Sequence, residues 1–196
     1  ADSLTLGQGS GIISRAFGEG RLGDVVVRSK TVSLTDGAVI KVGDQTDPGT
    51  AGNVTIDADS VGISGGSSIS SQAFAADAGQ VAIAAKGLTL DNGSIVTQTN
   101  GIGRGGDVVL QVGSMNLSNG ATLNSSASAT GRAGDMAMNV GTLSLANGSS
   151  ISSASTGTEA GINPDGTTQA PGTAGNVVIT ATGSFTSDAS SIATSA

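Results

Sequence analysis

The chain has 196 residues, a formal net charge of −7, and no Cys, His, Trp or Tyr. Without thiols and imidazoles, a disulfide framework, cysteine zinc sites and histidine general bases are excluded. The 8 basic residues are scattered, which argues against a nucleic-acid partner, because phosphate binding needs clustered Lys and Arg. No basic-then-apolar signal peptide begins the chain, and no run approaches the roughly 18 apolar residues of a membrane span. We therefore expect either a cytoplasmic chain or a mature or excised piece of an exported one.

A unit of 27–29 residues repeats along the chain, and each copy opens with a glycine. Within a unit, aliphatic and polar residues alternate over three short runs that turn-forming residues separate, as in half-buried strands. Residues 1–22 match the unit from its second run onward, with Leu4, Leu6 and Ile12. The opening glycines that follow are Gly23, Gly52, Gly79, Gly106, Gly134 and Gly175.

Aliphatic residues recur at fixed positions after each opening glycine. They stand two and four residues on, as Val54 and Ile56 do, and nine and eleven residues on, as Val61 and Ile63 do. The position seventeen residues on, with its counterpart in residues 1–22, predicts one inward-facing core ladder. Its members are Ile12, Ile40, Ile69, Val96, Leu123, Ile151 and Ile192.

This periodicity predicts a parallel β-helix. Helical repeats have similar lengths, but no 3.6-residue period is present, and abundant Gly, Ser, Thr and Asn disfavour helix. Three short strands per coil, stacked about 4.8 Å from those of the next coil, satisfy the backbone. We therefore expect an all-β single domain over residues 1–196, with about seven coils that start near residues 23, 52, 79, 106, 134 and 175. Right-handed winding is expected from the general rule for parallel crossovers.

Two polar positions recur at the corners of the predicted coils. A dipeptide such as Asp36-Gly37 or Asn119-Gly120 follows the second run and tolerates the positive φ of a sharp turn. The residue after the opening glycine is Asp, Asn or Gln in each coil. Stacked side chains there form either a structural ladder or a cation site. Neither column resembles a calcium-binding nonapeptide, so we expect no metal or cofactor.

Two coils depart from the pattern. About 13 extra turn-forming residues before Gly175 predict a surface loop over residues 156–173, with Asn163, Pro164, Asp165 and Gly166 as a candidate loop motif. In the last coil, Ser184 and Thr186 stand where other coils have aliphatic residues, with Phe185 between them. The second strand of that coil is therefore either frayed or shifted by one residue, so that Phe185 points inward.

Two outward-facing surfaces are candidates for function. The third residue after each opening glycine forms an apolar row, which is either a partner surface or a set of tolerated small β-formers. Its members are Val26, Thr55, Ala82, Val109, Ala137 and Val178. The second surface is a row of outward hydroxyls in the third run, and regular hydroxyl arrays suggest ice binding as a further alternative. Its members are Ser68, Ser70, Thr97, Thr122, Ser150 and Ser152, and Val39, Lys41, Ile95 and Asn124 interrupt the array.

Catalysis has little support from the residues present. The acidic residues fall mostly at corners, and no aromatic platform for a sugar ring accompanies them. Asp57 and Asp59 are close in sequence, but neighbouring coils add no equivalent carboxylates, whereas acid–base chemistry needs two that differ in environment. A polysaccharide-active β-helix enzyme is therefore the weakest of the alternatives.

The order of these signals resembles the repeats of filamentous-haemagglutinin-like exoproteins. A Leu-x-Leu pair, an Asn-Gly or Asp-Gly turn, Ser-x-Ile-x-Ser, a Gly-rich link and Ala-Gly-Asn-Val-x-Ile follow one another, as in Leu143–Ser153 and Ala51–Ile56. Residues 13–27 are similar to links in the large forms of that family. The resemblance implies an adhesin on the bacterial cell surface, secreted through an outer-membrane partner by two-partner secretion. The family's N-terminal secretion signature is not evident, and residues 162–166 match it only superficially.

These observations lead to a non-catalytic structural or adhesive rod that mediates attachment or matrix formation. The chain starts at a second strand and stops after a third, so both ends of the rod are expected to be open. Neighbouring coils of a longer chain would cover them, or other copies stacked end to end, which builds a filament. An extracellular filament subunit is thus the alternative function. The remaining expected partners are cell-surface or matrix glycans.

Overall fold

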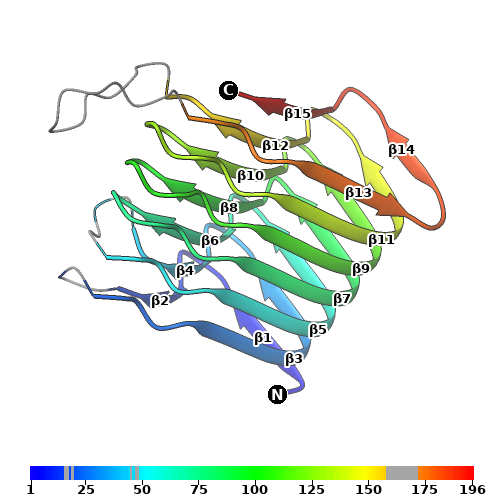
Figure 1. Cartoon of the computed structure of the whole chain (residues 1–196). Helices are drawn as coiled ribbons and strands as arrows, with labels where there is room; N and C mark the ends of the chain where they lie inside the picture. The colour runs from blue at the N-terminus through cyan, green and yellow to red at the C-terminus, as the bar shows by residue number, and fades with distance from the viewer. Residues whose placement is uncertain (16–17, 19, 45, 47–48, 158–171) are drawn as a thin grey trace, which may run out of the picture.

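The computed structural model describes residues 1–15, 18, 20–44, 46, 49–157 and 172–196. Its regular secondary structure is entirely β-strand, and parallel sheets wind into a β-solenoid of about five turns (Figure 1). The described residues contain no helix long and apolar enough to cross a membrane. The all-β solenoid expected from the repeat is therefore present.

Two parallel sheets form the walls of the solenoid. The 8-stranded sheet runs in the order β1-β3-β5-β7-β9-β11-β13, and β14 also pairs with β11. Its strands are β1 (Ser3–Leu6), β3 (Val25–Leu34), β5 (Val54–Ser64), β7 (Val81–Asp91), β9 (Val108–Ser118), β11 (Met136–Leu145), β13 (Val177–Ala181) and β14 (Phe185–Ser187). The 7-stranded sheet contains β2 (Gly11–Ser14), β4 (Val39–Val42), β6 (Ser68–Ala73), β8 (Ser94–Thr99), β10 (Thr122–Ala127), β12 (Ser150–Ser155) and β15 (Ser191–Ser195).

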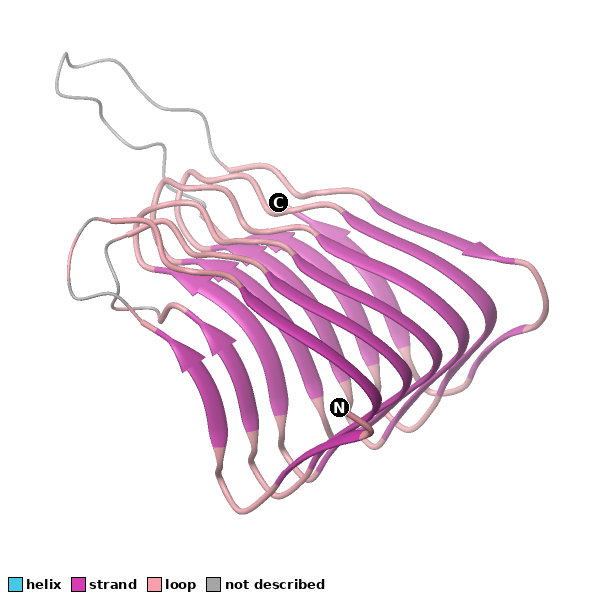
Figure 2. Cartoon of the chain, turned by 90° about the horizontal axis from the view of Figure 1, so that it is seen from below, coloured by secondary structure: helices cyan, strands magenta, loops and turns pink. Residues whose placement is uncertain are grey.

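The expected first and second strands of a coil are one continuous strand in β3, β5, β7, β9 and β11. Each curves around a corner of the solenoid (Figure 2). The ladder between β3 and β5 skips one pair at this bend, between Ser29 and Thr31. Only in the last coil are the two parts separate strands, β13 and β14. The backbone pairing is thus interrupted for one residue pair at the bend and resumes directly after it.

The core is a stack of aliphatic residues from both sheets. Ile40, Ile69, Leu123 and Ile151 are fully buried and in register, as the core ladder predicts. At the two ends, Ile12 is only partly buried, and Ile192 pairs with Ile151 but remains 40% exposed. These end residues have a coil on one side only.

One member of the predicted ladder is wrong. Val96 pairs with the outward Ser70 and is half-buried, whereas Ile95 pairs with Ile69 and is completely buried. The reason is the corner before β8, where Ile95 follows Leu90 after five residues, while Ile69 follows Ile63 after six. Because side chains alternate between faces, this shorter corner moves the inward position by one residue.

The corner dipeptides adopt the predicted positive φ. Asp36, Asn119 and Asn147 have φ of 54°, 56° and 53°, and the glycine after each has a φ of 76°. Asn92 also has a positive φ, but Gly93 is not among the positive-φ residues, so this corner makes a shorter turn. The stacked left-handed residues explain why Asn, Asp and Gly recur there.

In the last coil, Phe185 pairs with Leu143 and thus occupies a core position, which confirms the shift by one residue. Nothing among the described residues covers Phe185 on its far side, and it is 49% exposed. The predicted surface loop over residues 156–173 follows β12 in the sequence, and residues 158–171 of it are not described. Its candidate motif, Asn163, Pro164, Asp165 and Gly166, lies outside the described residues.

Candidate functional site

The predicted apolar row is one continuous column on the outer face of the 8-stranded sheet. Register pairs join its neighbouring members, Val26, Thr55, Ala82, Val109, Ala137 and Val178. Val26 and Val178 are 51% and 57% exposed, and the four residues between them are half-buried.

The middle of this row forms a shallow hollow. Thr55, Ala82 and Val109 line it together with Arg28, Asp57 and Gln111 of the next outward column, and its volume is about 270 Å³. The small side chains of Ala82 and Ala84 lie between larger register neighbours in the two columns. The hollow can accept an apolar group beside a polar edge, but no cluster of reactive side chains converges on it.

The outer face of β6, β8, β10, β12 and β15 carries no charged residue. One outward column consists only of hydroxyls: Ser68, Ser94, Thr122, Ser150 and Ser191. The next consists of Ser70, Val96, Asn124, Ser152 and Ala193, and the third of Gln72, Gln98, Ser126, Ala154 and Ser195. Neighbours are about 4.8 Å apart along the solenoid and about 6.6 Å apart along a strand.

Two residues that were expected on the face of the hydroxyl array point into the core instead. Thr97 points inward and is buried, and Ile95, expected to interrupt the array, is a core residue. Ser70 is outward in register but almost completely covered. Val39 and Lys41 interrupt the array only in β4. The uncharged face is therefore continuous across five strands, and the shorter corner before β8 hides this continuity in the sequence.

Sequence reasoning missed a buried column of hydroxyls. Ser125 Oγ donates to the carbonyl of Gly106 (2.9 Å) and accepts from the amide of Gly134 (2.8 Å). Ser71 and Ser153 connect the opening glycines of successive coils in the same way. The signal that could have found them is a Ser or Thr two residues after each central ladder position. These hydroxyls satisfy backbone groups that the turn of each coil leaves unpaired.

The opening glycines stack directly on one another. A Cβ on Gly106 would collide with the backbone carbonyl of Gly79, and one on Gly134 with that of Gly106. The coil starts at Gly52, Gly79, Gly106, Gly134 and Gly175 thus share a close approach of two backbones, which only glycine allows. This column is scaffold.

The residues after the opening glycines form a ladder of side chain to backbone hydrogen bonds in two runs, from Asp24 to Gln80 and from Asp107 to Asn176. The amide of Asn53 donates to Asp24 Oδ1 (2.7 Å), that of Asp135 to Asp107 Oδ1 (2.8 Å), and that of Asn176 to Asp135 Oδ1 (2.8 Å). The backbone hydrogen bond from Asn176 and the nearby Arg132 hold the pKa of Asp135 below its ordinary value, although burial opposes them.

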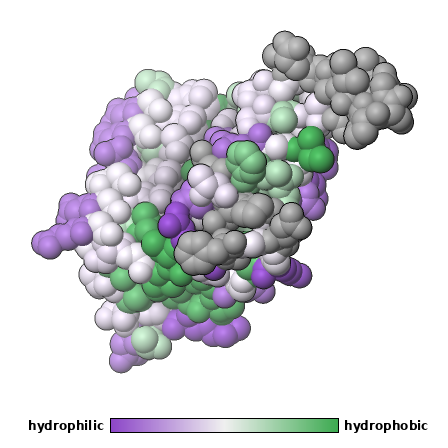
Figure 3. All heavy atoms as spheres, turned by 90° about the vertical axis from the view of Figure 1, so that its left-hand side faces the viewer, coloured by the Kyte–Doolittle hydropathy of each residue, from purple (hydrophilic) through white to green (hydrophobic). Residues whose placement is uncertain are grey.

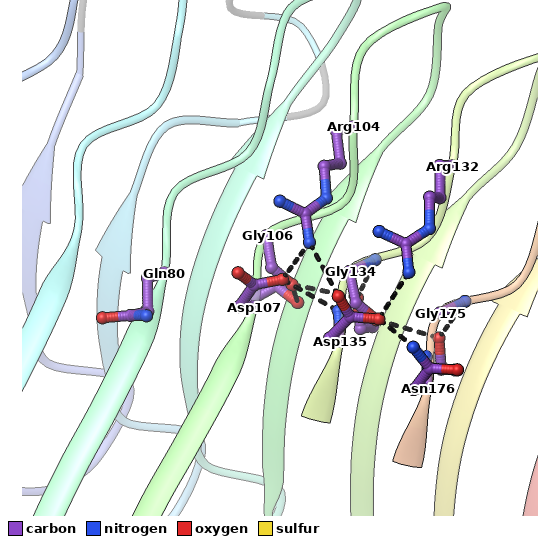
Figure 4. Close-up of polar contacts among 12 residues, drawn as sticks. Gln80, Arg104, Gly106, Asp107, Arg132, Gly134, Asp135, Gly175 and Asn176 are labelled. Carbon is purple, nitrogen blue, oxygen red and sulfur yellow. Dashed lines mark hydrogen bonds and ion pairs between the residues drawn. The ribbon is translucent and has the colours of Figure 1, made fainter. Parts of the chain in front are cut away.

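Two arginines neutralise this ladder where two carboxylates are stacked (Figure 4). Arg104 Nη2 bonds to Asp107 (2.6 Å) and to Asp135 (3.2 Å), and Arg132 Nη2 bonds to Asp135 (2.7 Å). In the sequence, Arg stands three residues before Asp in each coil that has Asp after its opening glycine. Among the described residues, no three His, Cys, Asp or Glu come together as a group that could hold a metal. The ladder is a structural ion-pair network.

Asp57 and Asp59 lie in two different environments. Asp57 lies on the outer face of β5, in register with Arg28. Asp59 forms an exposed ion pair with Lys86 (2.8 Å), which lowers the pKa of Asp59 and raises that of Lys86. Both shifts favour the charged forms of Asp59 and Lys86, so neither of these two side chains is suited to exchange a proton near neutral pH.

Apolar side chains are least covered toward the ends of the solenoid. Leu4 and Leu6 pack on the core but are only half-buried, and apolar surface gathers in the lower part of Figure 3, toward the N-terminal end. At the other end, Phe185 and Ile192 remain exposed. Both ends thus leave core side chains partly uncovered.

Comparison with protein-family models, with curated proteins and with solved structures gives no match to this chain. The resemblance to filamentous-haemagglutinin-like exoproteins therefore rests on the repeat pattern alone.

Proposed function

We propose that the chain is a non-catalytic rod of a secreted bacterial surface protein, which mediates attachment or matrix formation through its outer faces. The observation that supports this best is the uncharged face over β6, β8, β10, β12 and β15. From the resemblance of its repeats, we further propose that the rod is exported by two-partner secretion. We also propose that it winds right-handed and has about seven coils.

The chemistry of the uncharged face suits a neutral glycan. Its hydroxyls and amides both donate and accept hydrogen bonds, as sugar hydroxyls do. Short side chains such as Ser94 and Thr122 lose little conformational entropy when a partner covers them. A charged face would instead retain its water, because desolvating a charge without a partner is costly. The face is thus a regular surface for an extended neutral polymer, which the negative net charge of the protein does not repel.

Placing positive charges on this face tests the proposal. The double variant Thr122→Lys/Ser150→Lys changes two register partners on the uncharged face. The matched control, Thr89→Lys/Asn116→Lys, changes two exposed register partners on the other sheet and adds the same net charge. We expect binding to immobilised neutral polysaccharides and to bacterial matrix to fall at least about tenfold in the first variant only. Equal binding by both variants and the parent protein would contradict the proposal.

The uncovered end residues support a second candidate, an extracellular filament built by end-to-end stacking. Phe185 and Ile192 are in register with the core but exposed, so a further coil from the same chain or from another copy would bury them. The variant Phe185→Ser/Ile192→Ser removes that apolar contact. Concentration-dependent fibres that electron microscopy detects in the parent but not in the variant would favour the filament, and a monomer at high concentration would exclude it.

A further inference from the structure

Three Asn-Gly dipeptides occupy the same corner of successive coils. They are Asn92-Gly93, Asn119-Gly120 and Asn147-Gly148, and all three asparagines are exposed with a φ between 53° and 56°. We propose that Asn92 is a site of spontaneous deamidation, which is modified well before Asn119 and Asn147. The three share the following glycine and the left-handed φ of the asparagine, but Gly93 lacks the positive φ of Gly120 and Gly148. We attribute the expected difference in rate to the hydrogen bonds that this shorter turn removes.

The reaction needs only water. The backbone nitrogen of the glycine loses its proton and attacks Cγ of the preceding asparagine, the Cγ–Nδ2 bond breaks, and ammonia leaves a cyclic succinimide. Water then opens the ring at either carbonyl and yields aspartate or isoaspartate. The slow step therefore requires a free glycine N–H and a carboxamide that can rotate toward it.

Both requirements are blocked at Asn119 and Asn147. The amide of Gly120 donates to the carbonyl of Asn147 (2.9 Å), and the amide of Gly148 donates to that of Ala189 (2.8 Å). Their carboxamides are held as well, since Asn119 Nδ2 donates to Asp91 and Asn147 Nδ2 donates to Asn119 Oδ1 (3.3 Å). Attack at either site first requires these bonds between coils to break.

Asn92 lacks both restraints. Within the described part of the chain, no acceptor receives the amide N–H of Gly93, and the carboxamide of Asn92 makes no hydrogen bond. The cause is the shorter corner before β8. In the coil before it, the second corner glycine, Gly66, donates to the carbonyl of Asn92 (2.8 Å), but Gly93 has no equivalent bond to the next coil. The change in coil length that shifts β8 thus also leaves the buried amide of Gly93 without the hydrogen bond between coils that Gly120 and Gly148 make, while the side chain of Asn92 is exposed.

The product alters the corner in two ways. Aspartate or isoaspartate adds a negative charge beside Asp91, whose carboxylate already accepts hydrogen bonds from Ser118 and Asn119. Isoaspartate also adds a backbone carbon to the shortest of these corners. The uncharged face begins two residues later, at Ser94, so the modification places a charge at its border.

Peptide mapping by mass spectrometry of the intact folded chain, aged at pH 8 and 37 °C, tests the proposal. We expect Asn92 to convert about tenfold faster than Asn119 and Asn147, the protection that one hydrogen bond of ordinary net strength provides. The same chain unfolded in urea is the control, and there the three rates should converge. Equal rates in the folded chain, or faster loss of Asn119 or Asn147, would overturn the proposal.

Insertion of one glycine after Gly93 provides a matched variant, because it restores the longer corner of the preceding coil. We expect the rate at Asn92 to fall to that of Asn119 while the other two sites stay unchanged. If Asn92 reacts at its original rate in a folded insertion variant, the short corner is not the cause and the proposal fails. If the insertion prevents folding, the comparison of the folded and unfolded parent chain still decides the result.

Discussion

At the scale of single residues, the buried hydroxyl of Ser125 makes the clearest contribution to stability. We expect Ser125→Ala to destabilise the protein by about 1–3 kcal/mol, because the buried amide of Gly134 loses its acceptor. Ser126→Ala is the control, since Ser126 faces outward on the same strand and should change the stability by less than about 0.5 kcal/mol. Urea denaturation measures both, and equal effects would show that the hydroxyl bonds contribute nothing specific.

A second prediction concerns the charge of Asp135. The pKa of its carboxyl is lowered in the folded protein, so the carboxylate stabilises the fold above the unfolded value of about 3.9, and this contribution is lost as the pH falls through the lower folded value. The side chain is 37% exposed, so solvent screening limits the effect to about 1 kcal/mol. Asp135→Asn should therefore be less stable than the parent at pH 7, and the difference should shrink toward pH 2. A difference that is independent of pH would contradict this.

At the scale of elements, the register of β8 is open to a direct test. Ile95→Ala should cost about 2–4 kcal/mol, because it empties a fully buried core position, whereas Val96→Ala should cost about 0.5 kcal/mol. The original ladder, with Val96 in the core, predicts the reverse order. Thermal or urea unfolding of the two variants distinguishes the two registers.

The stacking of coils depends on the opening glycines. Gly106→Ala should destabilise the protein by more than about 4 kcal/mol, because its Cβ would meet the rigid backbone of Gly79. Gly62→Ala is the matched control within β5, where a Cβ meets open space, and it should leave the stability unchanged or raise it slightly. Similar losses of soluble folded protein in both variants would contradict a special role for the glycine column.

The sequence could predict those features of the elements that recur in every coil. The aliphatic columns and the corner dipeptides each repeat, so a chance match is averaged out, and the all-β solenoid, most of its core ladder and most of its corner turns agree with the structure. The errors arise where one coil differs in length, as at Asn92-Gly93, because one deleted residue reverses which side chains face inward. The burial of Ser125 and Thr97 could not be predicted for another reason. A Ser or Thr in the sequence does not show whether its hydroxyl faces water or bonds to buried backbone groups. The residues of the predicted apolar row lie in one column, whereas in the predicted hydroxyl array Thr97 faces inward.

At the scale of the whole molecule, the solenoid has no central nucleus that all coils share. Each coil packs only on its neighbours, and the stability of such proteins is roughly a sum of terms for coils and for their interfaces. Among the described residues, charged side chains lie at the corners, at the bend, on the outer face of the 8-stranded sheet and, as Lys41, on β4. The face over β6, β8, β10, β12 and β15 is uncharged. A rod of this kind can be extended by adding coils without disturbing the surface that it presents.

This architecture predicts a gradient of hydrogen exchange along the solenoid. Amides of β7 and β9, with a coil on both sides, should exchange at least about tenfold more slowly than those of β2 and β15, with a coil on one side only. Hydrogen–deuterium exchange with mass spectrometry on the intact chain measures this, and uniform protection would contradict it. Repeating the measurement at high protein concentration separates the two candidate functions. End-to-end stacking should then protect β14 and β15 at one end together with β1 and β2 at the other, while a rod that acts through its outer faces should leave the gradient unchanged.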